Sequence, residues 1–203
     1  MRFKDHNRRG LFLAETLANS HTQSGQELIK TANGLYRKKT PHRPWVIALN
    51  EEAALASLAW NLRAVFEAST VEEAVGILNG ILLYSQARPV ITRHDADSWH
   101  LHFADDNSPN SSLIGATAAT ALAMLLCDTG LSRIGSCADP DCSRVFIDVS
   151  RNNGKKYCST RCSTRASVAA HRERQRGPGP GPAAGDSRRV TDRHRPDRKR
   201  ATA

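Results

Sequence analysis

The sequence is poor in aromatic residues and has no long uninterrupted apolar segment. Phe, Tyr and Trp make up 5% of the 203 residues, and hydrophobic residues make up 39%, enough for one modest core. The longest apolar segment, residues 113–127, is interrupted by glycine and threonine, and we expect it to be too short to span a bilayer. The apolar residues 11–14 end at Glu15, which is too early for the core of a signal peptide. We therefore expect a soluble cytoplasmic protein, and the length allows either one ordinary domain with a small additional module or one larger domain.

Sequence signatures of an enzyme are also missing. The chain has no glycine-rich phosphate-binding loop and no nucleophile elbow. The paired carboxylates at residues 51–52 and 72–73 suit the positive ends of predicted helices. Cys127 lies in a predicted apolar helix, which predicts a buried core thiol. His100 and His102 alternate with apolar residues, so we expect them on the exposed face of a strand, without the third ligand that a metal site needs. We expect no enzymatic activity.

Four of the five cysteines lie close together as two pairs, Cys137 with Cys142 and Cys158 with Cys162. Four residues separate the first pair, three separate the second, and fifteen lie between the pairs. Such spacing is typical of a structural Zn²⁺ site, in which each pair supplies one half of a tetrahedron. Four sulfur ligands leave no open coordination position, so we expect one structural zinc ion. Two disulfides, which need an oxidising compartment, and four unrelated thiols are the alternatives.

The residues around the cysteines predict a knuckle, a hairpin and a helix. A turn is expected inside the first cysteine pair, at residues 139–141. A strand at residues 145–147 is expected to pair with a second strand at Tyr157, through a turn at residues 152–154. Residues 159–160 are expected to cap a helix that has the last cysteine in its first turn. The prediction is a treble-clef-like finger that folds with its metal.

Several further residues of this segment form a specific pattern. It consists of Phe146, Asp148 and Ser150 after the first cysteine pair, and of a basic pair and an aromatic residue before Cys158. With its cysteine spacing, the segment resembles the CGNR zinc finger, which ends bacterial proteins described as stress-induced transcriptional regulators. The family's Cys-Gly-Asn-Arg is Cys-Ser-Thr-Arg here, at residues 162–165, and its Arg-Arg-Trp is Lys-Lys-Tyr. The resemblance implies a DNA-binding regulatory function.

The chain before the finger predicts a mainly helical domain. We expect an apolar element over residues 10–20, helices over residues 25–39, 50–66, 70–84 and 111–127, and a hairpin of strands at residues 89–92 and 99–103. Asn50 is expected to cap the second helix, and Thr70 to open the third with a capping box. This order of elements resembles the ABATE domain, the helical domain that precedes the CGNR finger. The two resemblances together cover residues 10–176.

Positive charge is concentrated in the C-terminal third. Residues 1–132 contain 12 Lys and Arg against 13 Asp and Glu, whereas residues 133–203 contain 17 against 7. This asymmetry indicates a polyanionic partner, most often nucleic acid, although a solvated basic tail gives the same pattern. From Gly177 the chain alternates glycine and proline, which predicts disorder. We therefore expect a mainly helical domain over residues 1–130, a zinc finger over residues 131–176 and a disordered basic tail over residues 177–203.

The helix expected after Ser159 carries arginines at helical spacing. A helical wheel places four of them within about 60° of one another, namely Arg161, Arg165, Arg172 and Arg176. Guanidinium groups make bidentate contacts with phosphates and with guanine edges. Lys155, Lys156 and Arg151 are expected to extend this surface with phosphate contacts. We predict that these seven side chains bind DNA; an ordinary solvated helix face is the alternative.

Together these patterns favour a cytoplasmic, zinc-dependent DNA-binding transcriptional regulator. Its N-terminal domain is expected to sense a signal or to mediate association, for example as a homodimer, and no membrane partner is expected. Other functions stay open as alternatives. The finger could dock on an acidic protein partner, an RNA-binding protein could use Tyr157 for stacking, and an enzyme could bind a substrate in the N-terminal domain.

Overall fold

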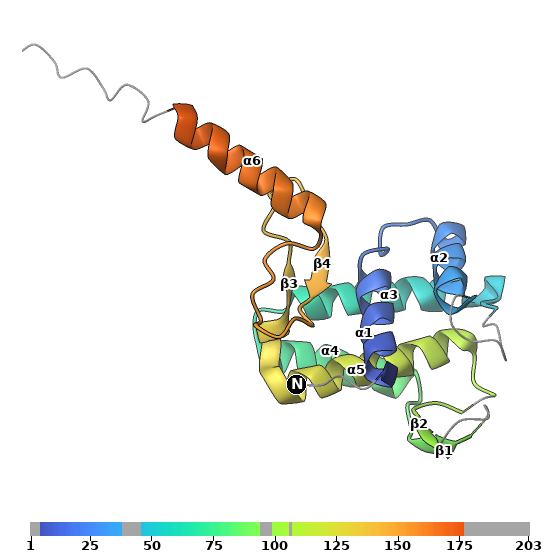
Figure 1. Ribbon diagram of the computed structural model, residues 1–203. Coiled ribbons are helices and arrows are strands. Elements are labelled where there is room, and N and C mark those ends of the chain that lie inside the picture. Colours follow the sequence, from blue (N-terminus) through green and yellow to red (C-terminus); the bar gives the residue numbers. More distant parts are fainter. Residues whose placement is uncertain (1–4, 38–45, 94–98, 106, 177–203) are drawn as a thin grey trace, which may run out of the picture. The chain divides into compact units, whose positions relative to one another are not determined.

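The computed structural model describes residues 5–37, 46–93, 99–105 and 107–176 (Figure 1). The tail predicted from Gly177 lies outside the described residues. The chain divides into two compact units, which meet between Ser167 and Val168 within one helix. The first unit contains the helical bundle and the four cysteines, and the second contains the end of that helix.

The described residues are mainly helical, which confirms the predicted fold class. The helices are α1 (Asp5–Ala18), α2 (Gly25–Arg37), α3 (Glu52–Glu67), α4 (Val71–Tyr84), α5 (Asn110–Thr129) and α6 (Thr160–Arg176). Two short 3₁₀ helices, η1 (Leu49–Glu51) and η2 (Gly130–Arg133), precede α3 and follow α5. The strands are β1 (Val90–Thr92), β2 (His100–His102), β3 (Ile134–Ser136) and β4 (Val145–Ile147). They form two antiparallel hairpins, β1 with β2 and β3 with β4.

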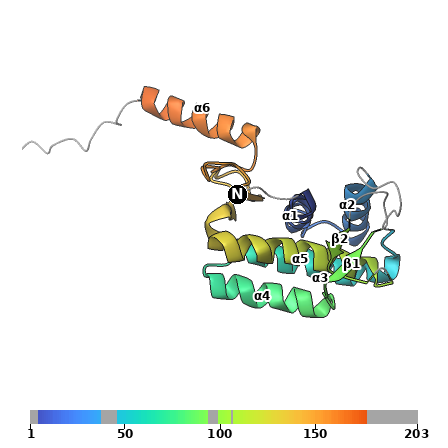
Figure 2. The same cartoon turned by 60° about the horizontal axis from the view of Figure 1, so that its bottom comes forward.

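Among the described residues, helices α1, α3, α4 and α5 form the centre of the bundle, and α2 packs against α3. α5 packs against α1 and α4, and α3 packs against the same two helices (Figures 1 and 2). Gly10 allows α1 to approach α5 closely, because a Cβ at this position would lie 2.5 Å from Cβ of Ala121 and 2.8 Å from the carbonyl oxygen of Thr117. The apolar stripe predicted on α3 is buried, from Leu55 to Phe66. The core therefore lies between α3 and α5, with α1 and α4 on either side.

The helix starts show which capping predictions hold. The hydroxyl oxygen of Thr70 accepts a hydrogen bond from the Glu73 amide at 3.1 Å, and the Glu73 carboxylate accepts one from the Ser69 amide at 2.8 Å. The cap at Thr70 is thus confirmed, but the predicted capping box is altered, because Glu73 accepts from the amide of Ser69 and not from that of Thr70. The cap predicted at Asn50 is wrong, because Asn50 lies inside η1 and α3 begins without a side-chain cap. The neighbouring Glu51 instead accepts a 2.7 Å bond from the Ser111 amide, which ties the start of α5 to η1.

Two predictions about side-chain environment are wrong. Cys127 is exposed, because it lies with the half-exposed Met124 on the side of α5 that faces away from the core. In the β1–β2 hairpin the apolar face is the exposed one. Ile91 and the opposite Leu101 are 71% and 42% exposed, whereas His102 is half-buried; the side chain of His100 lies outside the described part. The alternation of residues therefore gives the strand correctly and its outer face incorrectly.

One helical segment within the described residues, Asn110–Arg133, is long and apolar enough by length and composition to cross a membrane. The expectation that the apolar segment is too short therefore fails on length. Half of the segment's most apolar window is buried in the bundle, and the core helix of a soluble protein passes the same test.

Candidate metal centre

The first cysteine pair lies in the turn of the β3–β4 hairpin. Ile134 pairs with Ile147 and Ser136 with Val145. The knuckle, defined as residues 137–142 between the two cysteines, therefore lies in the connection between the two strands. The Cys137 amide continues the ladder by donating a 2.9 Å bond to the carbonyl of Arg144. The predicted pairing of residues 145–147 with a strand at Tyr157 is therefore wrong. The partner strand lies before the first cysteine, and Tyr157 lies in a bend before α6.

The second cysteine pair is held at the start of α6. The hydroxyl oxygen of Ser159 accepts a 3.3 Å bond from the Cys162 amide, which confirms the predicted cap and places Cys162 in the first turn. Two backbone donors join this segment to the knuckle. The Ala138 amide donates to the Lys156 carbonyl at 2.9 Å, and the Cys158 amide donates to Sγ of Cys137 at 3.4 Å.

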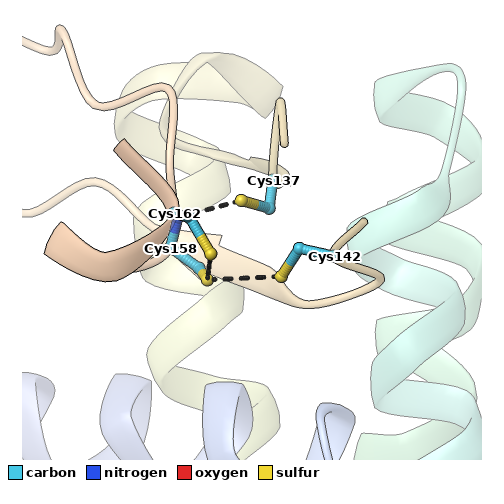
Figure 3. Close-up of side chains that lie close together, drawn as sticks. All are labelled: Cys137, Cys142, Cys158 and Cys162. Atoms are coloured by element: carbon cyan, nitrogen blue, oxygen red, sulfur yellow. Dashed lines mark hydrogen bonds between the residues drawn. The ribbon is translucent and has the colours of Figure 1, made fainter. Parts of the chain in front are cut away.

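The four cysteine side chains lie close together (Figure 3), and their sulfur atoms are all within 4.8 Å of one another. Sγ of Cys158 is 3.6 Å from Sγ of Cys142 and 3.7 Å from Sγ of Cys162. These distances exclude disulfides, whose sulfurs are about 2.05 Å apart. A tetrahedral zinc ion with Zn–S bonds of about 2.3 Å places its sulfurs about 3.8 Å apart. The cluster therefore fits one four-coordinate zinc ion. Because four protein sulfurs complete the tetrahedron, its role is structural.

The thiol environments are unequal. Burial opposes ionisation of Cys137, but hydrogen bonds from the backbone of Cys158 and Asp139 outweigh it and lower the Cys137 pKa to about 7. Burial and the neighbouring thiols of Cys142 and Cys162 raise the pKa of Cys158 to about 12. A divalent cation at the centre of the cluster would stabilise all four thiolates, which repel one another without it.

An ion pair joins the knuckle to α6 beside the sulfurs. The Asp139 carboxylate is 2% exposed, and it accepts a 2.7 Å bond from Nε of Arg165 and pairs with the Nη2 of the same guanidinium. Nη2 of Arg165 also lies 3.9 Å from Sγ of Cys162. The bond from Arg165 lowers the pKa of Asp139, so the pair remains charged at neutral pH. Arg165 is therefore bound within the finger, and its predicted DNA contact competes with this pair.

The loop between β4 and the second cysteine pair is held by Asp148. This buried carboxylate accepts 2.8 Å bonds from the amides of Ser150 and Lys155. Arg133 closes the loop from the other side by donating to the carbonyls of Asp148 and Ser150 at 2.9 and 2.8 Å. The loop thus has a fixed backbone. The residues of the motif noted in the sequence, Asp148 and Ser150, act in holding it.

The seven side chains predicted to bind DNA fall into three groups. Arg165 and Lys155 have partners within the finger, because Nζ of Lys155 donates to the Ile147 carbonyl at 3.2 Å and lies 5.0 Å above the ring of Phe146. The side chain of Arg176 lies outside the described part. The remaining four are exposed, namely Arg151, Lys156, Arg161 and Arg172. Arg144 and Arg174 are also exposed, and sequence reasoning left them out of the predicted surface.

The finger shares its core with the helical bundle. Val145 and Ile147 are 0% and 2% exposed, and they belong to the same buried cluster as Leu11 and Leu17 of α1. The opposite edge of β4 is bonded by the side chains of Glu15, in α1, and of Asn19, directly after α1. The division between residues 130 and 131 stays a prediction about domain boundaries, but the packing is continuous across it.

Comparison with known families agrees with this geometry. Residues 133–175 match the family model of the CGNR zinc finger. No curated protein matches the chain. The family match begins one residue before β3 and ends within α6, and so includes both cysteine pairs, Asp148 and Arg165. The chain therefore carries a CGNR zinc finger at residues 133–175, whose four cysteines form the site of one structural zinc ion.

Proposed function

We propose that the protein binds DNA through the zinc finger and helix α6, and that it acts as a transcriptional regulator in the bacterial cytoplasm. The observation that supports this most directly is the state of the basic side chains. Within the described part of the chain, six exposed cations of the finger and α6 have no internal partner: Arg144, Arg151, Lys156, Arg161, Arg172 and Arg174. Such side chains are available to phosphates, and their desolvation breaks no ion pair of the fold.

Helix α6 also has a shape suited to a DNA groove. Every described side chain from Ser167 to Gln175 is exposed. The major groove of B-DNA is about 12 Å wide and admits one α-helix. The cap at Ser159 and the coordination by Cys162 hold the first turn, so a zinc-loaded finger presents a helix with a fixed start. The regulatory role itself is proposed from the resemblance to the CGNR family.

Duplex binding can be tested with charge-matched variants. We expect Arg161→Ala/Arg172→Ala to weaken binding of a random duplex, measured by fluorescence anisotropy at two salt concentrations. Each phosphate contact contributes about 0.9 to the slope of log affinity against log salt, so the slope should fall by up to about 1.8. The control Arg8→Ala/Arg9→Ala removes the same charge from exposed positions of α1. If both double variants lose affinity equally, the binding is nonspecific attraction to a basic protein.

A second candidate function is docking of α6 on an acidic protein surface. Val168 is 43% exposed and lies within about 40° of Arg161 and Arg172 on the helical wheel. An apolar side chain among arginines suits the core of a protein interface. Unchanged duplex binding by Arg161→Ala/Arg172→Ala would favour this function over the first.

A further inference from the structure

Strand β4 has two edges, and only one of them pairs with a strand. Its first edge faces β3, with Phe146 opposite Gly135. The second edge faces the C-terminal end of α1, where Glu15 lies in the last turn of the helix and Asn19 is the first residue after it. An unpaired strand edge buried against a helix would leave its amides and carbonyls unsatisfied, at a considerable energetic cost. The groups on this edge therefore need partners, and apart from the Ile147 carbonyl, which accepts from Nζ of Lys155, they find them at the end of α1.

Glu15 and Asn19 supply those partners. Oδ1 of Asn19 accepts from the Val145 amide at 2.9 Å, and its Nδ2 donates to the Val145 carbonyl at 3.0 Å. Oε2 of Glu15 accepts from the Ile147 amide at 3.1 Å. The Asn19 amide group thus forms the pair of bonds that a residue of a neighbouring strand would form. Asn19 Nδ2 also donates to the Glu15 carbonyl at 2.9 Å, which holds the side chain in place.

We propose that Glu15 and Asn19 are positioning residues of the zinc finger, and that α1 completes the hairpin carrying Cys137 and Cys142 in place of a third strand. These side chains lie more than 100 residues before the first zinc ligand and outside the part that matches the finger family. They act on the sulfurs through β4, which leads directly back to the knuckle. The proposal is independent of DNA binding.

The zinc finger depends on the helical bundle for part of its core and for the bonding of one strand edge. Small zinc fingers usually bury their own core and fold with their metal. Here the inward side chains of β4 are buried in the bundle, and its outer backbone edge is bonded to Glu15 and Asn19 at the end of α1. The position of α1 therefore sets the position of one cysteine pair. Zinc affinity should depend on Glu15 and Asn19, which are not ligands of the metal.

Residue-resolved amide exchange on the zinc-loaded full chain tests the assignment. We expect Glu15→Ala to speed exchange of the Ile147 amide and Asn19→Ala that of the Val145 amide, each by roughly 5- to 100-fold. The matched control is Thr16→Ala, because the Thr16 hydroxyl bonds only within α1, to the carbonyl of Phe12. Glu15→Gln keeps an acceptor oxygen and should restore slow exchange at Ile147.

Zinc affinity provides the second measurement. Glu15→Ala/Asn19→Ala should weaken zinc binding by about tenfold or more, measured by competition with a chromogenic chelator, whereas Thr16→Ala should not. Equal acceleration of all core amides, or unchanged exchange at Val145 and Ile147, would overturn the proposal. If Asn19→Ala does not fold, Glu15→Ala against Glu15→Gln decides the question at Ile147 alone. Unchanged zinc affinity in the folded double variant would also refute it.

Discussion

Replacing Ile147 by alanine tests whether the zinc finger and the helices share one core. The side chain is 2% exposed and packs in the cluster that contains the bundle helices. Ile→Ala at such a site costs about 2–5 kcal/mol. For a protein of about 150–250 residues each kcal/mol lowers the melting temperature by about 2–4 °C, so the expected decrease is about 4–20 °C. The hydrogen bond that the Ile147 backbone amide donates to the Glu15 carboxylate remains, because the substitution changes only the side chain of residue 147.

The assay is thermal unfolding followed by far-ultraviolet circular dichroism, with zinc in excess. The helical signal comes mainly from the bundle, so a shared core requires this signal to melt earlier in Ile147→Ala. Val149→Ala is the control, since Val149 follows the same strand and is 45% exposed; it should change stability by less than about 0.5 kcal/mol. If Ile147→Ala weakens zinc binding but the helices melt at the wild-type temperature, the shared-core reasoning is wrong.

Three further predictions concern the metal centre. Native mass spectrometry should show one Zn²⁺ per chain, and Cys158→Ser should lose it; a variant that keeps tightly held zinc would contradict the ligand assignment. Arg165→Ala and Asp139→Asn should each weaken zinc binding roughly 10- to 100-fold in chelator competition, whereas Arg161→Ala should leave it unchanged; equal affinities throughout would show that the ion pair is incidental. Burial and the neighbouring thiols raise the pKa of Cys158 to about 12, and coordination requires its thiolate, so zinc affinity should fall as the pH falls. A titration in which affinity rises on acidification would disprove thiolate coordination.

Local patterns in the sequence predict the metal centre well. The spacing of the cysteine pairs gives the four ligands, and Ser159 gives the start of α6, because both depend on residues close together in the chain. The helix stripe from Leu55 to Phe66 is likewise predicted by its period. These features need no knowledge of distant partners.

Features that depend on distant partners escape sequence reasoning. β3 is missed because Ile-Gly-Ser contains a glycine, which is uncommon in strands. Residues 152–154 suggest a hairpin turn, and Asn153 does have a positive φ of 48°, but the loop is held by Asp148 instead of a second strand. A helical wheel places Arg165 among the surface cations. It contains only the residues of the helix, so it cannot show that Arg165 is paired with the carboxylate of Asp139. The sequence does contain one signal of this ion pair, namely the acidic residue Asp139 between the cysteines of the first pair.

The exposed half of α6 has a consequence for how this helix forms. An isolated helix shorter than about 12–15 residues is marginal in water, because its first turn is costly to nucleate. The nine residues of α6 from Ser167 to Gln175, a stretch shorter than this limit, are all exposed. Its nucleus is the turn fixed by the Ser159 cap and by Cys162 as a ligand. We therefore expect zinc coordination to nucleate the helix. Removal of zinc by a chelator should unwind the turns that carry the arginines, although the arginines keep their charge.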